Sequence, residues 1–325
     1  MAGYSKIPVA AIVGPTAAGK TRLGVELCLR FGGEVISGDS MQIYREMDIA
    51  TAKPSPEETR GVAHHLIDFL DPGEEFSVAD YLELAHKAAL DIYSRGKLPF
   101  LVGGTGLYVS SFLEDLRFAD IKVNRERKAR LEEIAAHEGS ADLYALLEKL
   151  DPELAAGLSP NDANRIIRGI LVFEAEGKSL SDFKRESRPE SPRYDSLLIG
   201  LNFRSRGKLY ERIDSRVDHM LAAGLLDEAG FFYRRGLSRT SRAAIGYKEL
   251  YPFIRGEITL EEAAENLKRE TRRFAKRQLT WFKKTKNINW IYIDDYSGFD
   301  DITDAAAELL ETAFALPRGR NGVLA

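Results

Sequence analysis

The chain has 325 residues, of which 44% are hydrophobic and 30% charged, and its formal net charge is −4. No apolar run approaches the roughly 18 residues that a bilayer-spanning helix needs, so we expect a globular protein with a sizeable core and no membrane insertion. The single cysteine, Cys28, excludes an internal disulfide and a cysteine-built zinc site, and the N-terminal residues lack the pattern of a secretory signal, so we expect a cytoplasmic protein.

Short β-rich segments alternate with helical patterns in the first third of the chain. The expected elements are strands over 7–13, 34–37, 65–70 and 98–102, and helices over 21–30 and 78–94. A strand, a helical crossover and another strand at this spacing predict a parallel sheet covered by helices. The predicted fold class is therefore α/β, with a parallel sheet of the P-loop NTPase type flanked by helices.

The pattern changes at about residue 120. Charged helical patterns over 125–137 and 161–174 predict an all-helical insertion, which ends in the Pro- and Ser-rich linker "SRPESPRYDS". Strand patterns return at 197–201 and 290–293. We therefore expect an α/β core made of residues 1–119 and 193–316, a helical insertion over 120–192, and a disordered tail over 317–325.

A glycine-rich loop with a Walker A pattern follows the first strand and precedes the first helix, as its mechanism requires. Converging backbone N–H groups, the helix N-terminus and the Lys20 ammonium bind phosphates, and the Thr21 hydroxyl is the candidate Mg²⁺ ligand. The alternative is a chance glycine-rich turn. The candidate phosphate-binding residues are Gly14, Pro15, Thr16, Ala17, Ala18, Gly19, Lys20 and Thr21.

The loop alone does not identify which phosphate compound it binds. An ATP-dependent kinase also needs an aspartate at the end of another buried strand to organise its metal ion. The strand over 98–102 ends in glycines, which leaves Asp68 and Asp294 near other strand-like segments. The sequence therefore favours a different phosphate compound without excluding ATP.

A polar segment that contains Asp39 follows the strand over 34–37. Because the carboxyl ends of parallel strands meet at one edge of a sheet, Asp39 is expected to face the glycine loop across a ligand crevice. We interpret Asp39 as a general base. The alternative is that Asp39 or Ser40 caps a following helix.

A basic segment, residues 268–286, contains only one acidic residue, Glu270. On a helical wheel the basic side chains fall in one half, and Leu267, Phe274, Trp281 and Phe282 fall in the other. We interpret the basic face as a binding surface for the phosphates of a nucleic acid, and a merely solvated face is the alternative.

Taken together, the sequence resembles the tRNA dimethylallyltransferases, also called tRNA isopentenyltransferases. The resemblance extends from Ile12 to Phe282, with small-for-small departures at Ala18, Gly38 and Gly169 and without a cysteine/histidine finger after the core. The motifs that carry it, in chain order, are "GPTAAGKT", "SGDSMQIY", "IATAKPS", "HHLIDFLDPGEEFSVADY", "LVGGTGLY", "SPNDANRIIRGI", "RIDSRVDHML", "AIGYKEL" and "TRRFAKRQLTWF".

The resemblance implies transfer of a dimethylallyl group from dimethylallyl pyrophosphate to N6 of the adenosine 3′ of the tRNA anticodon. The phosphate loop, with Mg²⁺, would then hold the departing pyrophosphate, and Thr105 and Arg216 would assist it. Asp39 would accept the proton of the amine. From the sequence alone, a helix cap explains Thr105 equally well. For Arg216 the alternative is an ordinary solvated helix residue.

The resemblance also implies which residues contact tRNA, and we expect no obligate protein partner. Arg165 and Arg168 share a helix face in the insertion, although such a face is often only solvated. With the residues of the basic segment included, the candidate tRNA-binding residues are Asp39, Ser40, Met41, Gln42, Thr105, Arg127, Asn164, Arg165, Ile166, Ile167, Arg168, Arg272, Arg273, Lys276 and Arg277.

Three other functions stay open at this stage. One is a small-molecule P-loop kinase that binds ATP, and another is a prenyltransferase that acts on free adenine nucleotides. The third is an RNA-binding module with a degenerate nucleotide site. The helical insertion and the basic segment argue against the second, and the intact loop with Asp39 argues against the third.

Overall fold

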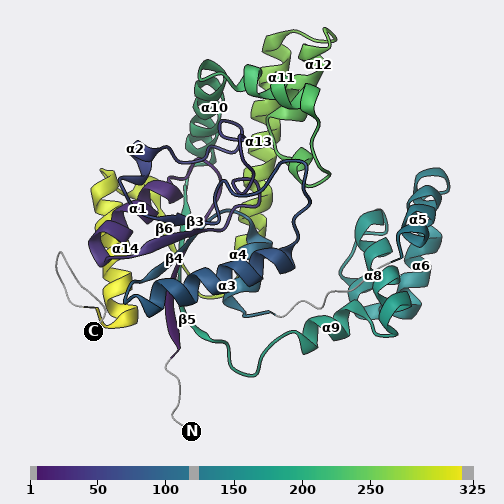
Figure 1. Cartoon of the computed structure of the whole chain (residues 1–325), viewed down its shortest axis with the longest axis horizontal. Coiled ribbons are helices and arrows are strands. Elements are labelled where there is room, and N and C mark those ends of the chain that lie inside the picture. Colours follow the sequence, from purple (N-terminus) through teal and green to yellow (C-terminus); the bar gives the residue numbers. More distant parts are fainter. Residues whose placement is uncertain (1–5, 117–123, 317–325) are drawn as a thin grey trace. The chain divides into compact units, whose positions relative to one another are not determined.

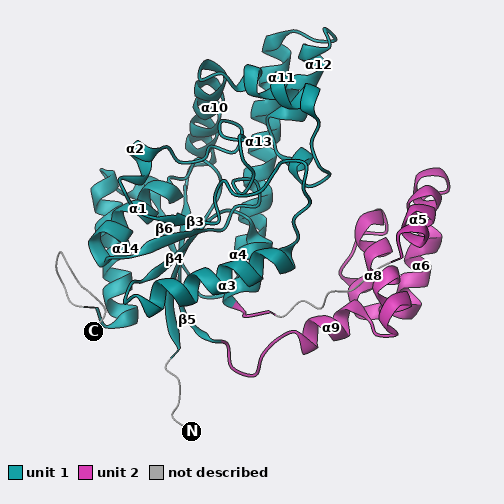
Figure 2. Ribbon diagram, viewed as in Figure 1, with its two compact units in different colours: residues 1–113, 193–325 teal, residues 114–192 magenta. Residues whose placement is uncertain are grey.

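We describe residues 6–116 and 124–316 in a computed structural model of the chain (Figure 1). The chain divides into two compact units, residues 1–113 with 193–325 and residues 114–192 (Figure 2). The sequence-based boundaries were 119/120 and 192/193. The tail expected over 317–325 lies outside the described residues.

The larger unit is built on a six-stranded parallel sheet, which confirms the expected fold class (Figure 1). Across the sheet the strand order is β3-β2-β4-β1-β5-β6. The strand bounds are β1 Ile7–Val13, β2 Glu34–Ser37, β3 His64–His65, β4 Pro99–Val102, β5 Tyr194–Asn202 and β6 Ile288–Tyr292.

The central strand, β1, pairs with β4 on one side and with β5 on the other. Its register with β5 runs from Ile7 opposite Tyr194 to Val13 opposite Gly200. Because β5 follows the insertion in sequence, the chain leaves the sheet and returns to its centre. The phosphate loop therefore follows a strand that is paired on both sides.

Helices pack around this sheet, and clear capping signals set several of their starts. Ser77 and Asp80 form a capping box at the start of the helix Val78–Ser94, which confirms the bounds predicted from the sequence. The helices of this unit are α1 Lys20–Phe31, α2 Pro56–Thr59, α3 Val78–Ser94, α4 Gly106–Leu113, α10 Arg206–Ala222, α11 Leu225–Arg235, α12 Tyr247–Ile254, α13 Leu260–Phe282 and α14 Phe299–Phe314, with short 3₁₀ turns η1 Ser241–Ala243 and η2 Ile293–Asp295.

The strand predicted over 65–70 is wrong beyond His65. Leu66 and Asp68 have positive φ angles of 62° and 58°, which are incompatible with an extended strand. The chain turns there, and only Leu70 returns to form a bridge with Tyr44. The hydrophobic pattern of this segment gave no indication that Leu66 and Asp68 have a left-handed backbone conformation.

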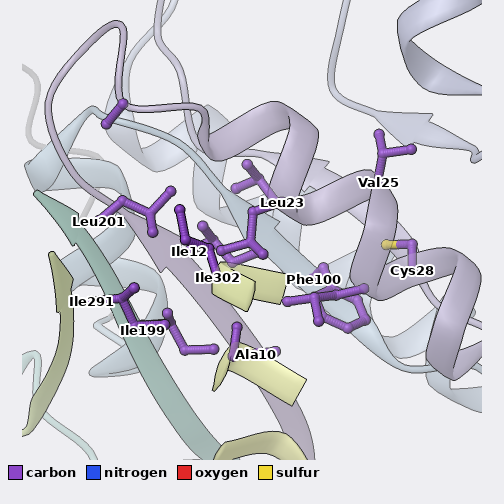
Figure 3. Packing of buried hydrophobic residues seen from close by; sticks show 14 of the residues in the cluster. Ala10, Ile12, Leu23, Val25, Cys28, Phe100, Ile199, Leu201, Ile291 and Ile302 are labelled. Carbon is purple, nitrogen blue, oxygen red and sulfur yellow. The ribbon is translucent and has the colours of Figure 1, made fainter. Parts of the chain in front are cut away.

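The main core fills the space between the sheet and helices α1 and α14. Figure 3 shows Ile12 of β1, Leu23 of α1 and Ile302 of α14 within one buried cluster. Cys28 lies in the same cluster as a free thiol, and burial raises its pKa. Within the described residues, no helix is long and apolar enough to cross a lipid bilayer.

The smaller unit is helical, as expected for the insertion. Its core contains Leu131, Leu147 and Ile170, and Gly169 packs so closely that an added Cβ would lie 2.6 Å from Leu147 Cδ1. The described helices are α5 Arg125–His137, α6 Ala141–Leu150, α7 Pro152–Ala156, α8 Ala163–Glu176 and α9 Leu180–Glu186. The helix predicted over 161–174 begins two residues later because Asp162 is its N-cap.

Candidate active site

The phosphate loop connects β1 to α1 in a conformation held by contacts from distant segments. Gly14 has a φ of 144°, and an added Cβ would lie 2.4 Å from the carbonyl oxygen of Leu201, so only glycine fits. Ala17 has a φ of 64°, and its carbonyl oxygen accepts a 3.0 Å hydrogen bond from Arg212 Nε. Lys20 Nζ donates to the carbonyl oxygen of Pro15 at 2.8 Å.

Asp39 lies in a turn directly after β2. Its Oδ1 accepts a 2.9 Å hydrogen bond from the backbone N–H of Met41, which is an Asx turn. The segment that follows is a series of turns, so the alternative in which Asp39 or Ser40 caps a helix is wrong. The Asx turn leaves the second carboxylate oxygen available to another group.

Thr105 links the loop after β4 to the Asp39 turn. Its hydroxyl oxygen accepts a 3.0 Å hydrogen bond from the backbone N–H of Ser40, and its own N–H donates to the carbonyl oxygen of Gly38 at 3.1 Å. Thr105 does precede α4, as the helix-cap alternative requires. However, its hydroxyl is engaged by Ser40, so the side chain joins two loops of the site.

Arg216 of α10 completes a group of three mutually interacting charges with Lys20 and Asp39. Removal from water and the Arg216 guanidinium lower the pKa of Lys20 from 10.5 to about 8, and Asp39 acts in the opposite direction. Burial also lowers the pKa of Arg216, while Asp39 raises it. Arg216 is half-buried, so the alternative of a solvated helix residue is wrong.

Two cavities meet at these residues. The first, of about 590 Å³, is lined mainly by polar and charged groups, and the second, of about 340 Å³, contains Asp39 and Thr105 in its wall. The residues that line both cavities are Lys20, Thr21, Ala52 and Arg216. A cavity with Lys20 and Arg216 in its wall therefore adjoins a cavity with the Asp39 carboxylate in its wall, which is the arrangement expected from the sequence.

The Gln42 side chain is bonded within the chain. Its Oε1 accepts from Ser37 Oγ at 3.2 Å, and its Nε2 donates to the carbonyl oxygens of Thr51 and Ala52 at 3.3 and 3.2 Å. Gln42 and Met41 both line the second cavity. In this conformation Gln42 shapes the cavity wall, whereas the sequence-based expectation was a direct contact with RNA.

The two other aspartates considered for a kinase metal site are engaged elsewhere. Asp68 pairs with Lys53 at 2.6 Å, and Asp294 accepts hydrogen bonds from the backbone N–H groups of Arg204 and Ser205 at the start of α10. Neither aspartate lines the two cavities described here.

The basic segment is helical only as far as Phe282, so Lys283, Lys284 and Lys286 follow α13. Several of its cations are already paired: Lys268 with Asp218 at 2.8 Å, Arg272 with Asp214 at 2.5 Å and Arg273 with Glu270 at 2.6 Å. The continuous free basic face expected from the helical wheel is therefore wrong in part. Trp281, expected on the buried side, is 40% exposed.

The exposed basic residues of α13 are Arg269, Arg273, Lys276 and Arg277. Arg273 pairs with Glu270, and Arg269 donates to Asn266 Oδ1 at 2.6 Å, whereas the described residues show no ion pair of Lys276 or Arg277. Arg277 lies over the ring of Phe274, and both line the second cavity. Arg277 and its neighbour in sequence Lys276 thus place exposed positive charge next to the candidate site.

The insertion residues expected to contact tRNA divide into two groups. Asn164, Arg165 and Arg168 are exposed on α8. Ile166 and Ile167 are buried at 0% and 3% exposure, so their side chains belong to the core of the insertion, and the expectation that these residues contact tRNA stays a prediction. Helical periodicity explains this, because consecutive residues face different sides.

Arg127 of α5 is not a free cation. Its guanidinium forms a two-pronged ion pair with Glu174 of α8, with Nη2 2.7 Å from Oε1. This pair holds α5 against α8. The assignment of Arg127 as a tRNA contact stays a prediction, and the ion pair with Glu174 argues against it.

Sequence reasoning missed Gln278, which is 5% exposed and bonds to both the phosphate loop and the Gly104 loop. A signal was present. At 100° per residue, Gln278 falls between Leu267 and Phe282 on the apolar side of the helical wheel. A polar amide at such a position needs a buried partner.

Comparisons with known proteins agree with this geometry. The profile of the family described as IPP transferase matches residues 42–285, and that of isopentenyl transferase matches residues 7–70. The chain belongs to the IPP transferase family. The matched residues include the glycine-rich loop, the Asp39 turn and strands β1 to β5, whereas β6 lies beyond them.

Relatives of high similarity carry one description. A tRNA dimethylallyltransferase of Caldanaerobacter subterraneus subsp. tengcongensis is 45% identical over 94% of this chain and 98% of its own length. A second, from Shouchella clausii, is 48% identical over 89% of this chain and 92% of its own length.

Solved structures of the family also resemble this chain. The tRNA isopentenylpyrophosphate transferase of Bacillus halodurans is 44% identical, with a TM-score of 0.70 over 95% of this chain and 99% of that one. A eukaryotic dimethylallyltransferase described as acting on tRNA is 29% identical, with a TM-score of 0.80 over 97% of this chain and 82% of that one.

Proposed function

We propose that this protein transfers the dimethylallyl group of dimethylallyl pyrophosphate to N6 of the adenosine that lies 3′ of the anticodon in tRNA, and that it releases pyrophosphate. The observation that carries the proposal is the shared wall of the two cavities, where Lys20 and Arg216 adjoin Asp39 and Thr105. This wall offers cations to a leaving group on one side and a carboxylate to an amine on the other.

The phosphate side stabilises the departing group. During transfer the allylic C–O bond breaks, its electron pair stays with the pyrophosphate, and positive charge develops on the allylic carbon. Fixed N–H donors of the loop, with Lys20 and Arg216, stabilise the negative charge that develops on the pyrophosphate. The lowered pKa of Lys20 is consistent with a site that is arranged to receive an anion.

Asp39 serves the acceptor side. The N6 lone pair is delocalised into the adenine ring, so the amine is a poor nucleophile until its proton is removed. As the new N–C bond forms, the amine proton passes to the Asp39 carboxylate. The Asx turn to Met41 fixes one carboxylate oxygen and orients the other.

Mg²⁺ fits this site through the Thr21 hydroxyl. Thr21 lines both cavities, and Mg²⁺ commonly binds through few protein groups together with substrate phosphates and water. Among the described residues no cluster of three or more His, Cys, Asp or Glu side chains suits a metal ion by itself. When bound, Mg²⁺ would neutralise charge on the departing pyrophosphate.

RNA is held by exposed cations on each unit. Arg277 of α13 lines the second cavity and its neighbour Lys276 is exposed, and Arg165 and Arg168 are exposed on α8. Such contacts position a phosphate backbone, whereas an extruded adenine is read inside a pocket. A free adenine nucleotide needs neither set of cations.

One incubation tests the function against its alternatives. The protein is mixed with Mg²⁺, dimethylallyl pyrophosphate labelled in the allylic group, and an unmodified anticodon stem-loop RNA. Parallel reactions replace the RNA with AMP, or replace the donor with labelled ATP plus candidate acceptors. We expect label in the RNA alone. Label transfer from ATP to an acceptor, with none from the allylic donor to RNA, would refute the proposal.

A further inference from the structure

Gln278 is a buried amide whose two ends contact two different loops of the candidate site. Its Oε1 accepts a 2.8 Å hydrogen bond from the backbone N–H of Thr16, and its Nε2 donates to the carbonyl oxygen of Gly104 at 3.0 Å. The partners lie 262 and 174 residues away in sequence. Gln278 therefore joins segments that the chain itself does not connect locally.

These contacts extend across the whole site. Thr16 belongs to the phosphate loop, while Gly104 directly precedes Thr105, whose hydroxyl accepts from the backbone N–H of Ser40. Ser40 in turn adjoins Asp39. Three hydrogen bonds, joined by the peptide links Gly104–Thr105 and Asp39–Ser40, thus connect the phosphate loop through Gln278 to the turn that carries the proposed base.

The chemistry of this position requires an amide. One end must accept from an N–H and the other must donate to a carbonyl, which a glutamate or an alanine cannot do together. The fit is close, because a Cβ added at Gly104 would lie 2.1 Å from Gln278 Nε2. The contact also uses the Thr16 N–H, so the phosphates are left with the N–H groups from Ala17 onward.

We propose that Gln278 is a positioning residue for the transfer reaction. It acts through the two loops: it holds the phosphate loop and the Gly104–Thr105 loop at a fixed separation, so that the leaving group and the base are aligned before substrates bind. Preorganisation of this kind lowers the barrier because alignment need not occur during the reaction. The inference rests on the proposed function.

The test compares Gln278→Ala and Gln278→Glu with Thr280→Ala, an exposed residue of the same helix whose hydroxyl bonds only to Lys276 O. The measurements are binding of inorganic pyrophosphate with Mg²⁺, hydrogen exchange of segments 14–21 and 103–105, and kcat and KM for the stem-loop RNA. Together these readouts separate loop positioning from a general loss of stability.

For Gln278→Ala we expect roughly tenfold weaker pyrophosphate binding, a kcat roughly tenfold lower, faster exchange in both segments and a KM for RNA within about twofold, because two hydrogen bonds are lost. Gln278→Glu retains the acceptor for Thr16 but not the donor for Gly104. We therefore expect that, relative to the unaltered protein, hydrogen exchange increases more in segment 103–105 than in segment 14–21. Thr280→Ala should match the unaltered protein.

The inference is overturned if Gln278→Ala lowers only the melting temperature and leaves pyrophosphate affinity and exchange of both segments unchanged. Should that variant not fold, Gln278→Glu decides, since unchanged exchange at 103–105 would overturn it equally. Failure of the proposed function would appear differently. The unaltered protein would then transfer no label to RNA, while pyrophosphate binding and exchange would still report on Gln278.

Discussion

Lys20 Nζ lies 2.8 Å from the carbonyl oxygen of Pro15, so the ammonium of the phosphate loop bonds to the loop itself. Burial and Arg216 lower the pKa of Lys20 to about 8, which places its titration within an accessible range. A bound pyrophosphate would draw the ammonium toward itself and favour its protonated form.

Pyrophosphate binding should therefore weaken as pH rises above about 8. The sign follows from the protonation state, since the anion binds the charged lysine and the free protein loses that charge above the pKa of Lys20. Isothermal titration calorimetry between pH 7 and 10 measures it. Lys20→Met should bind about tenfold to a hundredfold more weakly at pH 7.

The methionine variant is also the control, because pyrophosphate itself titrates in this range for both proteins. The difference between the two pH profiles isolates Lys20. Parallel profiles, with no extra loss of affinity in the unaltered protein above pH 8, would contradict the assignment.

Asp39→Asn separates the catalytic role of Asp39 from its structural role. The amide oxygen of asparagine can still accept from Met41 N–H and keep the Asx turn, but it cannot take the amine proton. We expect kcat to fall by about 10²-fold or more, while pyrophosphate affinity and melting temperature stay near their original values. Near-normal turnover in a steady-state transfer assay would remove Asp39 as the base.

The basic helix α13 should contribute to RNA binding through Lys276 and Arg277. Lys276→Ala and Arg277→Ala should each weaken binding and reduce the slope of log K against log salt by up to about 1. Arg272→Ala is the contrasting variant, because Arg272 is paired with Asp214 and should alter stability more than the salt slope. Salt titrations in a filter-binding or anisotropy assay measure this.

The opposite ranking would contradict the account. If Arg272→Ala lowered the salt slope while Lys276→Ala and Arg277→Ala left it unchanged, the phosphate contacts would lie on the paired side of the helix. In that case Arg272 would contact phosphates, as the helical wheel predicted, even though the structure shows it in an ion pair with Asp214.

The sequence predicted the general fold because its signals are local. The apolar segment 7–13, the Walker A spacing and the helical pattern over 78–94 each indicate a conformation within a few residues. The placement of Asp39 near the glycine-rich loop could also be predicted from the sequence, because the carboxyl ends of parallel strands lie at one edge of the sheet. These features need no knowledge of distant partners.

Features that depend on distant partners did not follow from the sequence. The ion pair of Arg272 with Asp214 joins α13 to α10, and nothing in the charge pattern of either helix identifies the other. Gln278 was visible as an amide on an apolar helix face, but its partners Thr16 and Gly104 were not. The left-handed residues Leu66 and Asp68 likewise interrupt a pattern that looks like a strand.

A loop that borders both cavities is held by Glu228 of α11. The Glu228 carboxylate accepts hydrogen bonds from the backbone N–H groups of Asp48, Ile49 and Ala50 at 2.8–3.0 Å and from the Tyr247 hydroxyl at 2.9 Å. Glu228→Gln replaces one acceptor oxygen with a donor, so we expect a loss of about 1–3 kcal/mol in the free energy of unfolding.

Chemical denaturation of Glu228→Gln and Tyr247→Phe tests this arrangement. The phenylalanine variant removes only one of the four donors, so its loss should be the smaller of the two. Equal losses would indicate that the tyrosine hydroxyl, rather than the three N–H groups, dominates the contact.

Glu34 is the first residue of β2 and lies at the end of the sheet opposite the candidate site. Glu34 as a whole is only 4% exposed, and its carboxylate bonds to Arg95, Lys97 and His65 at 2.6–2.7 Å. These partners, the Arg95 guanidinium above all, hold the pKa of Glu34 far below its ordinary value of 4.5. A depressed carboxyl pKa contributes stability above the unfolded pKa, and that contribution is lost as pH falls below about 4.5.

Glu34→Gln should therefore unfold more easily at pH 7, by about 2 kcal/mol, because the partly exposed cations reduce the cost below that of a fully buried pair. Its stability should also depend less on pH below 4.5. Glu83→Gln, on the exposed side of α3, is the control and should stay within about 0.5 kcal/mol. Matching pH profiles for the Glu34 and Glu83 variants would contradict the prediction.

Mass spectrometry of the RNA product tests the central claim most directly. Two anticodon stem-loops are incubated with the protein, Mg²⁺ and dimethylallyl pyrophosphate: one carries adenosine 3′ of the anticodon, and the other carries inosine, which has no N6 amine. The account predicts a gain of one dimethylallyl group on the adenosine and none on the inosine RNA. Equal modification of both, or modification of neither, would contradict it.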